Sequence, residues 1–599
     1  MSEVDLVIIG SGIYGLTTAH TYHRIHPAAR ILIIDAAPSI GGPWAPHRTF
    51  IGLKTNNLLG MYEHPDFPMN EQAFGVKKGE HIPAATMFDY LTAFVKWADI
   101  EHFLRLHTTV DVIERNDDSE EGWKLHCSSS VPSENKGQVV IKTKKLVIAA
   151  GVASAPFLPS YRTSRTFQPP VIHSKDFASH YSAIVKPNTH TTVVGCGKSA
   201  WDIAYACTTQ SSSTATILIR PDGNGPIWMT PTHVTPFRLW LEKLVHTRFF
   251  GFMSPCPWAT TTGLEGWLRA FFHRTWFGRK LVAGFWHVLG EDAIGLNGID
   301  SDPETKKLRP WRGAFEVGNA LSIHNYPTSF FELVKVGKIK ILVDEIASLD
   351  AERQVLLKSG GVLQTDAVVC ATGWRKGHKF RFEPPTLEKE FALPTTYPPT
   401  PEESALIKSA EKSLYRDFPY LRERDTSRVY HPSPSLRHTQ HPPAQTQPYR
   451  LYRFMVPPNL YRERSVAFAG ALMCLGGFTC AYIQSIWITA WLDGTMSPPR
   501  GYTHSKILEA TYRDTQYCVL RGAMSYGHTL PDIVFDTLSY FDMLLEDLKD
   551  HSVNKRRKGR ALIEYVSSYG PEDYQGLLDA REVSTRMVEH FLEQYGVSL

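Results

Sequence analysis

The stretch "DLVIIGSGIYGLTTA", from Asp5 to Ala19, reads as a buried strand, a glycine-rich turn and the start of a helix. Gly10, Gly12 and Gly15 have the spacing Gly-x-Gly-x-x-Gly. The first glycine permits a tight bend, the second lets the backbone approach a pyrophosphate, and the third allows the helix to pack closely on the sheet. The phosphates then meet the positive end of the helix. The stretch therefore predicts a dinucleotide-binding α/β unit.

A carboxylate ends the next predicted strand of this unit. The run "RILIID" finishes at Asp35, twenty residues after Gly15. A carboxylate at that position accepts hydrogen bonds from the ribose hydroxyls of a dinucleotide. Strand, loop, helix, strand and acid thus all favour nucleotide binding over a purely structural glycine turn.

A second stretch, "VVGCGKSAWDIA" at 193–204, repeats the pattern with Gly195, Gly197 and Ala200, and alanine is tolerated at the third position. The following strand ends at Arg220, after the same 25-residue interval as in the first unit. An arginine there suits the 2′-phosphate of NADP(H), which a carboxylate would repel. The alternative is an ordinary solvent-exposed arginine at a strand end.

Two loops imply two dinucleotides with different roles, a tightly held flavin and a nicotinamide that reduces it. A redox-active cysteine pair after the first loop would indicate a pyridine-nucleotide disulfide reductase instead. The eight cysteines are scattered, and none precedes Cys127. They form no Cys-x-x-Cys pair and have no metal-ligand spacing, so we expect reduced thiols and no metal.

Composition sets the broad class. A chain of 599 residues suggests two to four domains, and 43% hydrophobic with 21% charged residues is typical of globular proteins. The net charge of +4 creates no strong field for nucleic acid. The first strand begins almost at once, without a basic region and cleavage site, so we expect no secretory signal and a cytoplasmic location.

The order of predicted elements gives an α/β fold with two Rossmann-like dinucleotide-binding domains, the second inserted in the first. We expect a helical, aromatic-rich insertion in the second domain, an irregular Pro/His-rich insertion, and a helical C-terminal tail. The expected bounds are 1–165 and 365–495 for the FAD-binding domain, 166–364 for the NADPH-binding domain, 230–292 for the aromatic insertion, 383–450 for the irregular insertion and 496–599 for the C-terminal extension.

Two regions leave interpretations open. Residues 465–492 carry no charged side chain, so hydropathy alone would indicate a transmembrane helix. The strand-like start "SVAFAG" and the later glycines favour a buried strand, a flavin-contacting loop and a core helix. The aromatic helices of 230–292 are compatible with peripheral contact to a membrane such as the endoplasmic reticulum, with a substrate tunnel, or with ordinary core packing.

Six motifs follow one another along the chain. They are the paired loops, Gly41-Gly42-Pro43-Trp44, Thr55-Asn56 before Pro65-Asp66-Phe67-Pro68, Phe167-x-Pro169-x-x-x-His173-x-x-x-Phe177, Ala371-Thr372-Gly373, and Gln484-Ser485-x-Trp487. In this order they resemble the flavin-containing monooxygenases, the class B flavoprotein monooxygenases that include Baeyer–Villiger enzymes. Two positions depart from that family: Pro169 replaces a glycine and Ile486 replaces the usual arginine. The long insertions resemble those of larger fungal members used in secondary metabolism.

The resemblance implies that NADPH reduces FAD, that O2 then forms a C4a-(hydro)peroxyflavin, and that one oxygen atom passes to a small organic substrate in secondary-metabolite biosynthesis. Two alternatives remain open. One is Baeyer–Villiger oxidation of a ketone, for which Arg309 or Arg312 is a candidate arginine. The other is a non-oxygenating NADPH oxidase or dehydrogenase. The sequence indicates no nucleic-acid partner and leaves the oligomeric state undetermined.

The resemblance assigns Asn56 as the candidate catalytic residue, with its amide near the flavin–nicotinamide junction, although "TNN" is also favourable turn chemistry. His173 is expected to be structural, bridging the linker between domains. Cofactor contacts are implied at Gly10, Gly12, Gly15, Asp35, Gly42, Trp44, Thr55, Asn56, Val112, Gly195, Gly197, Ser199, Ala200, Arg220, Thr372, Gly373 and Gln484.

Overall fold

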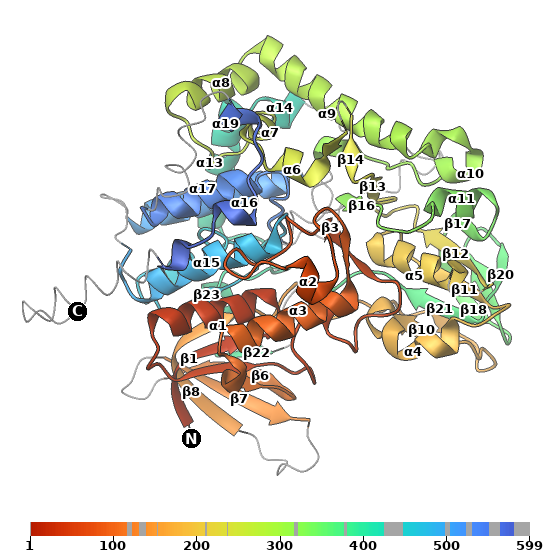
Figure 1. The fold of residues 1–599 in the computed structure, drawn as a ribbon, viewed down its shortest axis with the longest axis horizontal. Helices are drawn as coiled ribbons and strands as arrows, with labels where there is room; N and C mark the ends of the chain where they lie inside the picture. The colour runs from red at the N-terminus through yellow and green to blue at the C-terminus, as the bar shows by residue number, and fades with distance from the viewer. Residues whose placement is uncertain are drawn as a thin grey trace, which may run out of the picture.

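Two sheets with parallel cores organise the chain, as the paired glycine stretches predict (Figure 1). The computed structural model describes residues 2–579 except for 117–121, 131–138, 153, 210–211, 236–237, 317–320, 376–379, 424–446, 497–502, 523–529 and 550–562. In spatial order the first sheet contains β22 (Arg381–Glu383), β6 (Thr108–Arg115), β7 (Trp123–Ser129), β8 (Val139–Ile148), β1 (Ser2–Ile9), β2 (Ile31–Ile34) and β5 (Leu104–Arg105), and β23 (Val466–Phe468) also pairs with β8.

The core strands of the first sheet are buried on both faces, which explains their continuous apolar sequences. Leu6 and Ile8 of β1 face a core that includes residues of α1 (Ile13–Ile25), α3 (Ala84–Trp97) and α15 (Gly477–Leu492). Val7 alternates to the opposite face and packs in the same cluster as Trp123 of β7. The parallel register aligns the carboxyl ends of β1 and β2, where the first glycine loop begins.

The second sheet is entirely parallel, and the four-stranded sheet described below packs with one of its faces. Its last strand in sequence lies beyond residue 365, so the second sheet extends past the boundary expected from sequence, and the chain rejoins the first sheet at β22. In spatial order it contains β10 (Val171–His173), β21 (Ala367–Cys370), β11 (His190–Val194), β12 (Thr214–Ile219) and β17 (Ile339–Val343); the four-stranded sheet contains β20 (Val362–Gln364), β19 (Gln354–Leu357), β18 (Ile346–Asp350) and β9 (Arg162–Thr163).

The aromatic insertion forms helices, as its periodicity predicts, and its two longest helices follow the upper edge of the molecule in Figure 1. Short strands before and after the helices pair with each other and lie beside the second domain. The elements are β13 (Trp228–Thr230), β14 (His233–Val234), β15 (Leu239–Trp240), α6 (Leu241–Val245), α7 (Arg248–Phe252), α8 (Gly263–Arg274), α9 (Trp276–Leu296), α10 (Pro303–Lys306) and β16 (Leu321–Ile323).

The expectation of an irregular segment over 383–450 is wrong for α13 (Pro401–Asp417). Thr400 Oγ1 accepts a hydrogen bond from the Glu403 backbone N–H, and the Glu403 carboxylate accepts one from the Thr400 N–H. This capping box satisfies two free donors at the helix start. The buried Leu414 then anchors the helix in the main core. Residues 424–446 of the expected insertion lie outside the described part of the chain.

Residues 465–492 form a strand, a loop and a helix, as the favoured interpretation predicts. β23 pairs with β8, and every α15 residue from Phe478 to Leu492 is buried. No helix in the described part of the chain has both the length and the apolarity needed to cross a bilayer. The described part of the C-terminal extension is mainly helical, with α16 (His504–Arg521), α17 (Thr537–Asp547) and α19 (Ile563–Val566).

Candidate functional site

The first glycine loop is built by steric contact. Gly10 has φ +111°, and a Cβ added to it would lie 2.4 Å from the Ala149 carbonyl oxygen. A Cβ on Gly15 would lie 1.9 Å from the Gly10 carbonyl oxygen. Among the described residues, no side chain caps the N-terminus of α1 at Gly12. The loop therefore leaves helix N–H groups for an anion, which fits the pyrophosphate of a dinucleotide.

Asp35 lies beside this loop, as its spacing predicts. Its Oδ2 accepts hydrogen bonds from the Ser11 backbone N–H and hydroxyl, both at 2.7 Å. Its Oδ1 accepts one from the Ala37 N–H at 2.9 Å. A carboxylate oxygen accepts about two hydrogen bonds. Oδ1 therefore keeps capacity for a ribose hydroxyl.

The Gly-Gly-x-Trp motif packs against the same loop. Gly42 and Trp44 belong to the 3₁₀ turn η1 (Gly42–Trp44), and a Cβ on Gly42 would lie 3.4 Å from Gly12 Cα. The Trp44 indole N–H donates to the Tyr62 hydroxyl at 3.4 Å. The half-buried Trp44 therefore bonds to Tyr62 from a turn that contacts the first glycine loop through Gly42.

The second glycine loop repeats the contact of the first. Gly195 has φ +115°, and its added Cβ would lie 2.4 Å from the Ala371 carbonyl oxygen. Gly197 and Ser199 are exposed at the start of α5 (Lys198–Thr209), whereas Ala200 is fully buried against the core of the second domain. The exposed backbone and the close-packed base are the features that a second dinucleotide requires.

Arg220 lies at the end of β12 with 53% of its side chain exposed. Its ion-pair partner, Asp222, is 3.9 Å away and is itself half exposed. An exposed pair of this kind contributes little to stability. The guanidinium is therefore available to an anionic ligand at the edge of the second sheet.

The Ala-Thr-Gly motif forms one of the two linkers between domains. Thr372 Oγ1 donates to the Phe157 carbonyl, and the Phe157 N–H donates to the Gly373 carbonyl at 3.0 Å. His173 Nε2 donates to the same carbonyl at 2.9 Å, while its Nδ1 accepts from the Lys175 N–H. Both ring nitrogens of His173 are therefore engaged in holding the linker.

Asn56 lies on β3 (Lys54–Leu58), which pairs with β4 (His81–Pro83) and contacts β16 near the second domain. The Ser322 hydroxyl donates to Asn56 Oδ1 at 2.9 Å, and this bond fixes the orientation of the carboxamide. The described residues provide no hydrogen-bond partner for the Asn56 Nδ2 group. The half-buried amide thus retains its two donors for a ligand.

Glu242 holds the same strand from the other side. It is 1% exposed, and it accepts hydrogen bonds from Asn57 Nδ2, the Leu58 N–H and Trp240 Nε1. Burial raises the pKa of Glu242 to about 7, although the bonds from Leu58, Asn57 and Trp240 oppose that shift. This carboxyl therefore links the aromatic insertion to the strand that carries Asn56.

Gln484 and Val112, for which the resemblance implies cofactor contacts, are both buried. Gln484 is fully buried; its Oε1 accepts from the Gly470 N–H at 3.0 Å and its Nε2 donates to the Tyr540 hydroxyl at 2.8 Å. These bonds assign it to positioning the Gly470 turn, which packs on Tyr14 of α1. Val112 is buried in β6, paired with Arg381.

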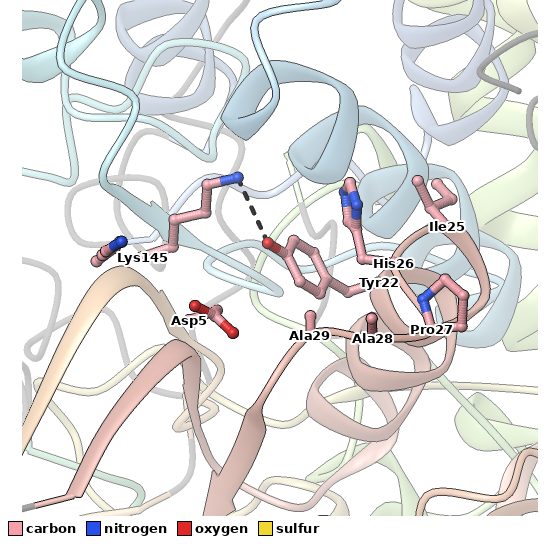
Figure 2. Close-up of a pocket in the computed structure, with 9 residues that line it drawn as sticks. Asp5, Tyr22, Ile25, His26, Pro27, Ala28, Ala29 and Lys145 are labelled. Atoms are coloured by element: carbon pink, nitrogen blue, oxygen red, sulfur yellow. Dashed lines mark hydrogen bonds between the residues drawn. The ribbon is translucent and has the colours of Figure 1, made fainter. Parts of the chain in front are cut away.

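A cavity of about 470 Å³ opens beside the end of α1 that precedes β2, at the opposite end of the first sheet from the glycine loop (Figure 2). Lys145, at its edge, donates to the Tyr22 hydroxyl at 3.4 Å and to Asp493 at 3.0 Å. Asp493 also contacts His26 at 2.8 Å. Ligands of open α/β sheets bind at the carboxyl ends of strands. The cavity is therefore not the nucleotide site, and its charged groups join α1, β8 and α15.

Family comparisons agree with this architecture. Residues 8–64 match the NAD(P)-binding Rossmann-like domain, and residues 79–229 match the L-lysine 6-monooxygenase/L-ornithine 5-monooxygenase family. The chain is 30% identical to the FAD-dependent monooxygenase resA of Aspergillus sclerotiorum over 96% of this chain and 97% of that protein. The chain belongs to the FAD-dependent monooxygenases. The monooxygenase rstn6 of Aspergillus nomiae is 29% identical over similar shares, 96% and 97%.

Solved structures similar to this monooxygenase have the same fold. Cyclohexanone monooxygenase from Rhodococcus sp. Phi1, bound to NADP⁺, aligns with a TM-score of 0.58 at 16% identity, over 92% of this chain and 98% of that one. S-allyl-L-cysteine S-oxygenase from Allium sativum aligns with a TM-score of 0.50 at 14% identity, over 97% and 98%. The predicted family and the Rossmann-like α/β fold class are confirmed.

Sequence reasoning about this monooxygenase missed the residues that hold β3. Glu242, Ser322 and Asn325 come from segments far along the chain, and none belongs to a motif. Lys198 lies inside the second loop motif but carried no prediction. A carboxylate within the largely apolar run "LWLEKLV" was the available signal for Glu242.

Replacing Glu242 by glutamine tests its burial. The folded pKa lies above the ordinary value of 4.5, so the stability contributed by protonated Glu242 is lost as pH rises from about 4.5 to about 7. That loss is on the order of 2–4 kcal/mol. In Glu242→Gln we expect the apparent melting temperature to depend less on pH between 5 and 7. Glu332→Gln, at an exposed helical ion pair, is the control. An unchanged pH slope in Glu242→Gln would contradict this assignment.

Proposed function

We propose that this monooxygenase binds FAD at the first glycine loop and NADPH at the second, and transfers one oxygen atom of O2 to a small organic substrate. The supporting observation is the repeated contact at Gly10 and Gly195. Each glycine closes against the carbonyl of an alanine that follows the neighbouring strand. Two equivalent dinucleotide cradles in one FAD-dependent enzyme fit a reductant and the flavin that it reduces.

In this proposal, different residues of the chain bind FAD, bind NADPH and contact the reacting oxygen. FAD, when bound, supplies hydride acceptance and reaction with oxygen. The loop at Gly10, Gly12 and Gly15 holds its pyrophosphate, and Asp35 its ribose. Arg220 binds the 2′-phosphate that distinguishes NADPH from NADH. Asn56 directs its free Nδ2 donors to the reacting oxygen, and the surrounding chain excludes water that would release hydrogen peroxide.

The substrate class stays a proposal between nitrogen, sulfur and carbon centres. The matched lysine/ornithine family favours an amine nitrogen, whereas the name of the structurally similar cyclohexanone monooxygenase favours a ketone carbon. Arg309, one candidate for Baeyer–Villiger chemistry, is engaged by Asp300 and Glu291 outside the glycine loops. The test is incubation with NADPH, ¹⁸O2 and a panel of small amines, thioethers and ketones. One ¹⁸O atom in a product supports the function, and peroxide as the sole product with every compound contradicts it.

We also propose that the corner of α8 and α9 contacts an anionic membrane surface. Trp267, Trp276 and Phe277 are 64%, 68% and 57% exposed. Trp267 stacks on Phe271, which contacts Phe277, so these rings are continuous. The Lys280 ammonium lies 5.9 Å from the Trp276 ring centroid. Exposed aromatic rings beside basic groups suit a lipid interface.

Arg220→Ala tests the choice of NADPH. A charge-assisted hydrogen bond contributes about 1.5–3 kcal/mol, so we expect the apparent KM for NADPH to rise by about tenfold to a hundredfold. The KM for NADH stays nearly unchanged, because NADH lacks the 2′-phosphate. Arg353→Ala, with a similarly exposed arginine on the four-stranded sheet, is the control. Equal losses for both nucleotides would show that Arg220 acts on folding.

Asn56→Ala tests oxygen transfer. Because hydride transfer requires only the two stacked dinucleotides, the variant retains FAD and is reduced by NADPH at a near-normal rate. Loss of a preorganised donor costs about 2.7–4 kcal/mol in the step that depends on it. Product therefore falls, and hydrogen peroxide per NADPH rises. Ser322→Ala, which frees the amide to rotate, gives a smaller change in the same direction. Full coupling in Asn56→Ala would reduce Asn56 to a turn residue.

Sedimentation with vesicles containing phosphatidylserine tests the membrane contact. We expect the wild-type protein to bind, and Trp267→Ser with Trp276→Ser to lose most of the binding, because exposed rings supply the buried apolar area. Val336→Ser removes an equally exposed apolar side chain elsewhere and serves as the control. Self-association through this corner, seen as concentration-dependent sedimentation without vesicles, would contradict the proposal.

A further inference from the structure

We propose that Lys198 is a positioning residue: through Asn325 it holds β3, and therefore Asn56, in register with the second dinucleotide domain. This inference rests on the role proposed above for Asn56. A lysine in a nucleotide loop would ordinarily be assigned to a phosphate, as a point charge. The contacts of Lys198 indicate a different role.

The Lys198 side chain turns inward from the second glycine loop. It is 15% exposed, and its ammonium contacts the Asp202 carboxylate one helical turn along α5. The ammonium also donates to Asn325 Oδ1 at 3.0 Å and lies 4.7 Å from the Tyr326 ring centroid. Tyr326 completes the cluster by donating from its hydroxyl to Asp202 at 3.0 Å. The Lys198 ammonium thus bonds to groups of the protein interior, Asp202 and Asn325.

Asn325 carries the contact across to the first domain. It is 6% exposed, and its Nδ2 group donates to the carbonyl oxygens of Lys54 and Thr55, both at 3.1 Å. Its Oδ1 accepts from Lys198, so both ends of the carboxamide are engaged. Ser322, three residues earlier, donates to Asn56. The segment 322–325 therefore forms hydrogen bonds to three consecutive residues of β3, Lys54, Thr55 and Asn56.

Two histidines and one ion pair surround the contact between Lys198 and Asn325. Burial lowers the pKa of His81 and of His324 to about 4, and the Lys198 charge contributes to both shifts. Both imidazoles are therefore neutral near pH 7, and His81 Nδ1 donates to the Thr55 carbonyl at 2.9 Å. Lys198 and Asp202 form the buried ion pair of this cluster.

The geometry has a consequence for catalysis. Groups held in separate domains react efficiently only when both domains keep the reacting atoms aligned, and a misplacement of about 1 Å can cost a hundredfold in rate. Lys198 belongs to the loop that binds the second dinucleotide, and β3 belongs to the first domain. The Lys198–Asn325–β3 contact therefore aligns Asn56 with whatever that loop holds.

Asn325→Asp distinguishes the two contacts of this connection, Lys198 to Asn325 and Asn325 to β3, which together we call the relay. Aspartate still accepts from Lys198 but cannot donate to Lys54 and Thr55. Lys198→Met breaks the other end, and Lys335→Met, at an exposed helical ion pair of the same domain, is the matched control. Amide hydrogen exchange of a peptide spanning residues 54–58 reports on β3 directly, in the FAD-loaded protein with and without NADP⁺.

We expect both variants to speed exchange in 54–58 by about twofold to tenfold, as for loss of one net hydrogen bond. In the double variant, exchange in 54–58 should be no faster than in the faster of the two single variants. NADP⁺ should slow exchange in this segment less than it does in the wild-type protein. The KM for NADPH should change little. A large rise in KM for Lys198→Met alone, with normal exchange in Asn325→Asp, would make Lys198 a phosphate ligand and overturn the relay. Lower melting temperatures with unchanged exchange would also overturn it. Absence of ¹⁸O transfer by the wild-type enzyme would defeat the proposed function, whereas these exchange data stand apart from it.

Discussion

Contact between a glycine and a neighbouring carbonyl is the constraint on which both halves of the molecule depend. At Gly10 and at Gly195, a Cβ would lie 2.4 Å from the carbonyl oxygen of Ala149 and of Ala371. A side chain at either position would separate two adjacent parallel strands at their carboxyl ends. In dinucleotide-binding α/β sheets, ligands bind at those ends. The positive φ of both glycines adds a backbone requirement that other residues meet only at a cost.

The same contact explains where the domains connect. Ala371 closes the second loop, and the next two residues, Thr372 and Gly373, bond to the returning linker at Phe157. The crossing between domains therefore starts one residue beyond the alanine that contacts Gly195. The linker and the second glycine loop therefore lie close together, and interfaces between domains are common places for ligand sites.

Local patterns predicted the parts of the site that local geometry determines. Glycine spacing gave both loops, and Asp35 lies beside Ser11 as expected, because these features need only a strand, a turn and a helix. The interactions of Gln484 were not accessible in this way, since Tyr540 lies 56 residues away. The helix at 401–417 was missed although Thr400 and Glu403 formed a readable capping box. The boundary at 365 failed to include β21, because its pairing with β11 is a tertiary property.

Strand β3 shows why the position of Asn56 depends on the whole molecule. Among the described strands it pairs with the short β4 alone, so much of its backbone has no ladder partner in the described part of the chain. Side chains supply the missing bonds: Asn325 to the Lys54 and Thr55 carbonyls, and Glu242 to the Leu58 N–H. These two side chains come from different segments, one beside the second domain and one in the aromatic insertion. Buried polar groups of this kind are costly unless satisfied, so the strand is stable in one position only when both segments are in place. The donor proposed to control oxygen is therefore carried on an element whose position depends on contacts from both the aromatic insertion and the segment beside the second domain.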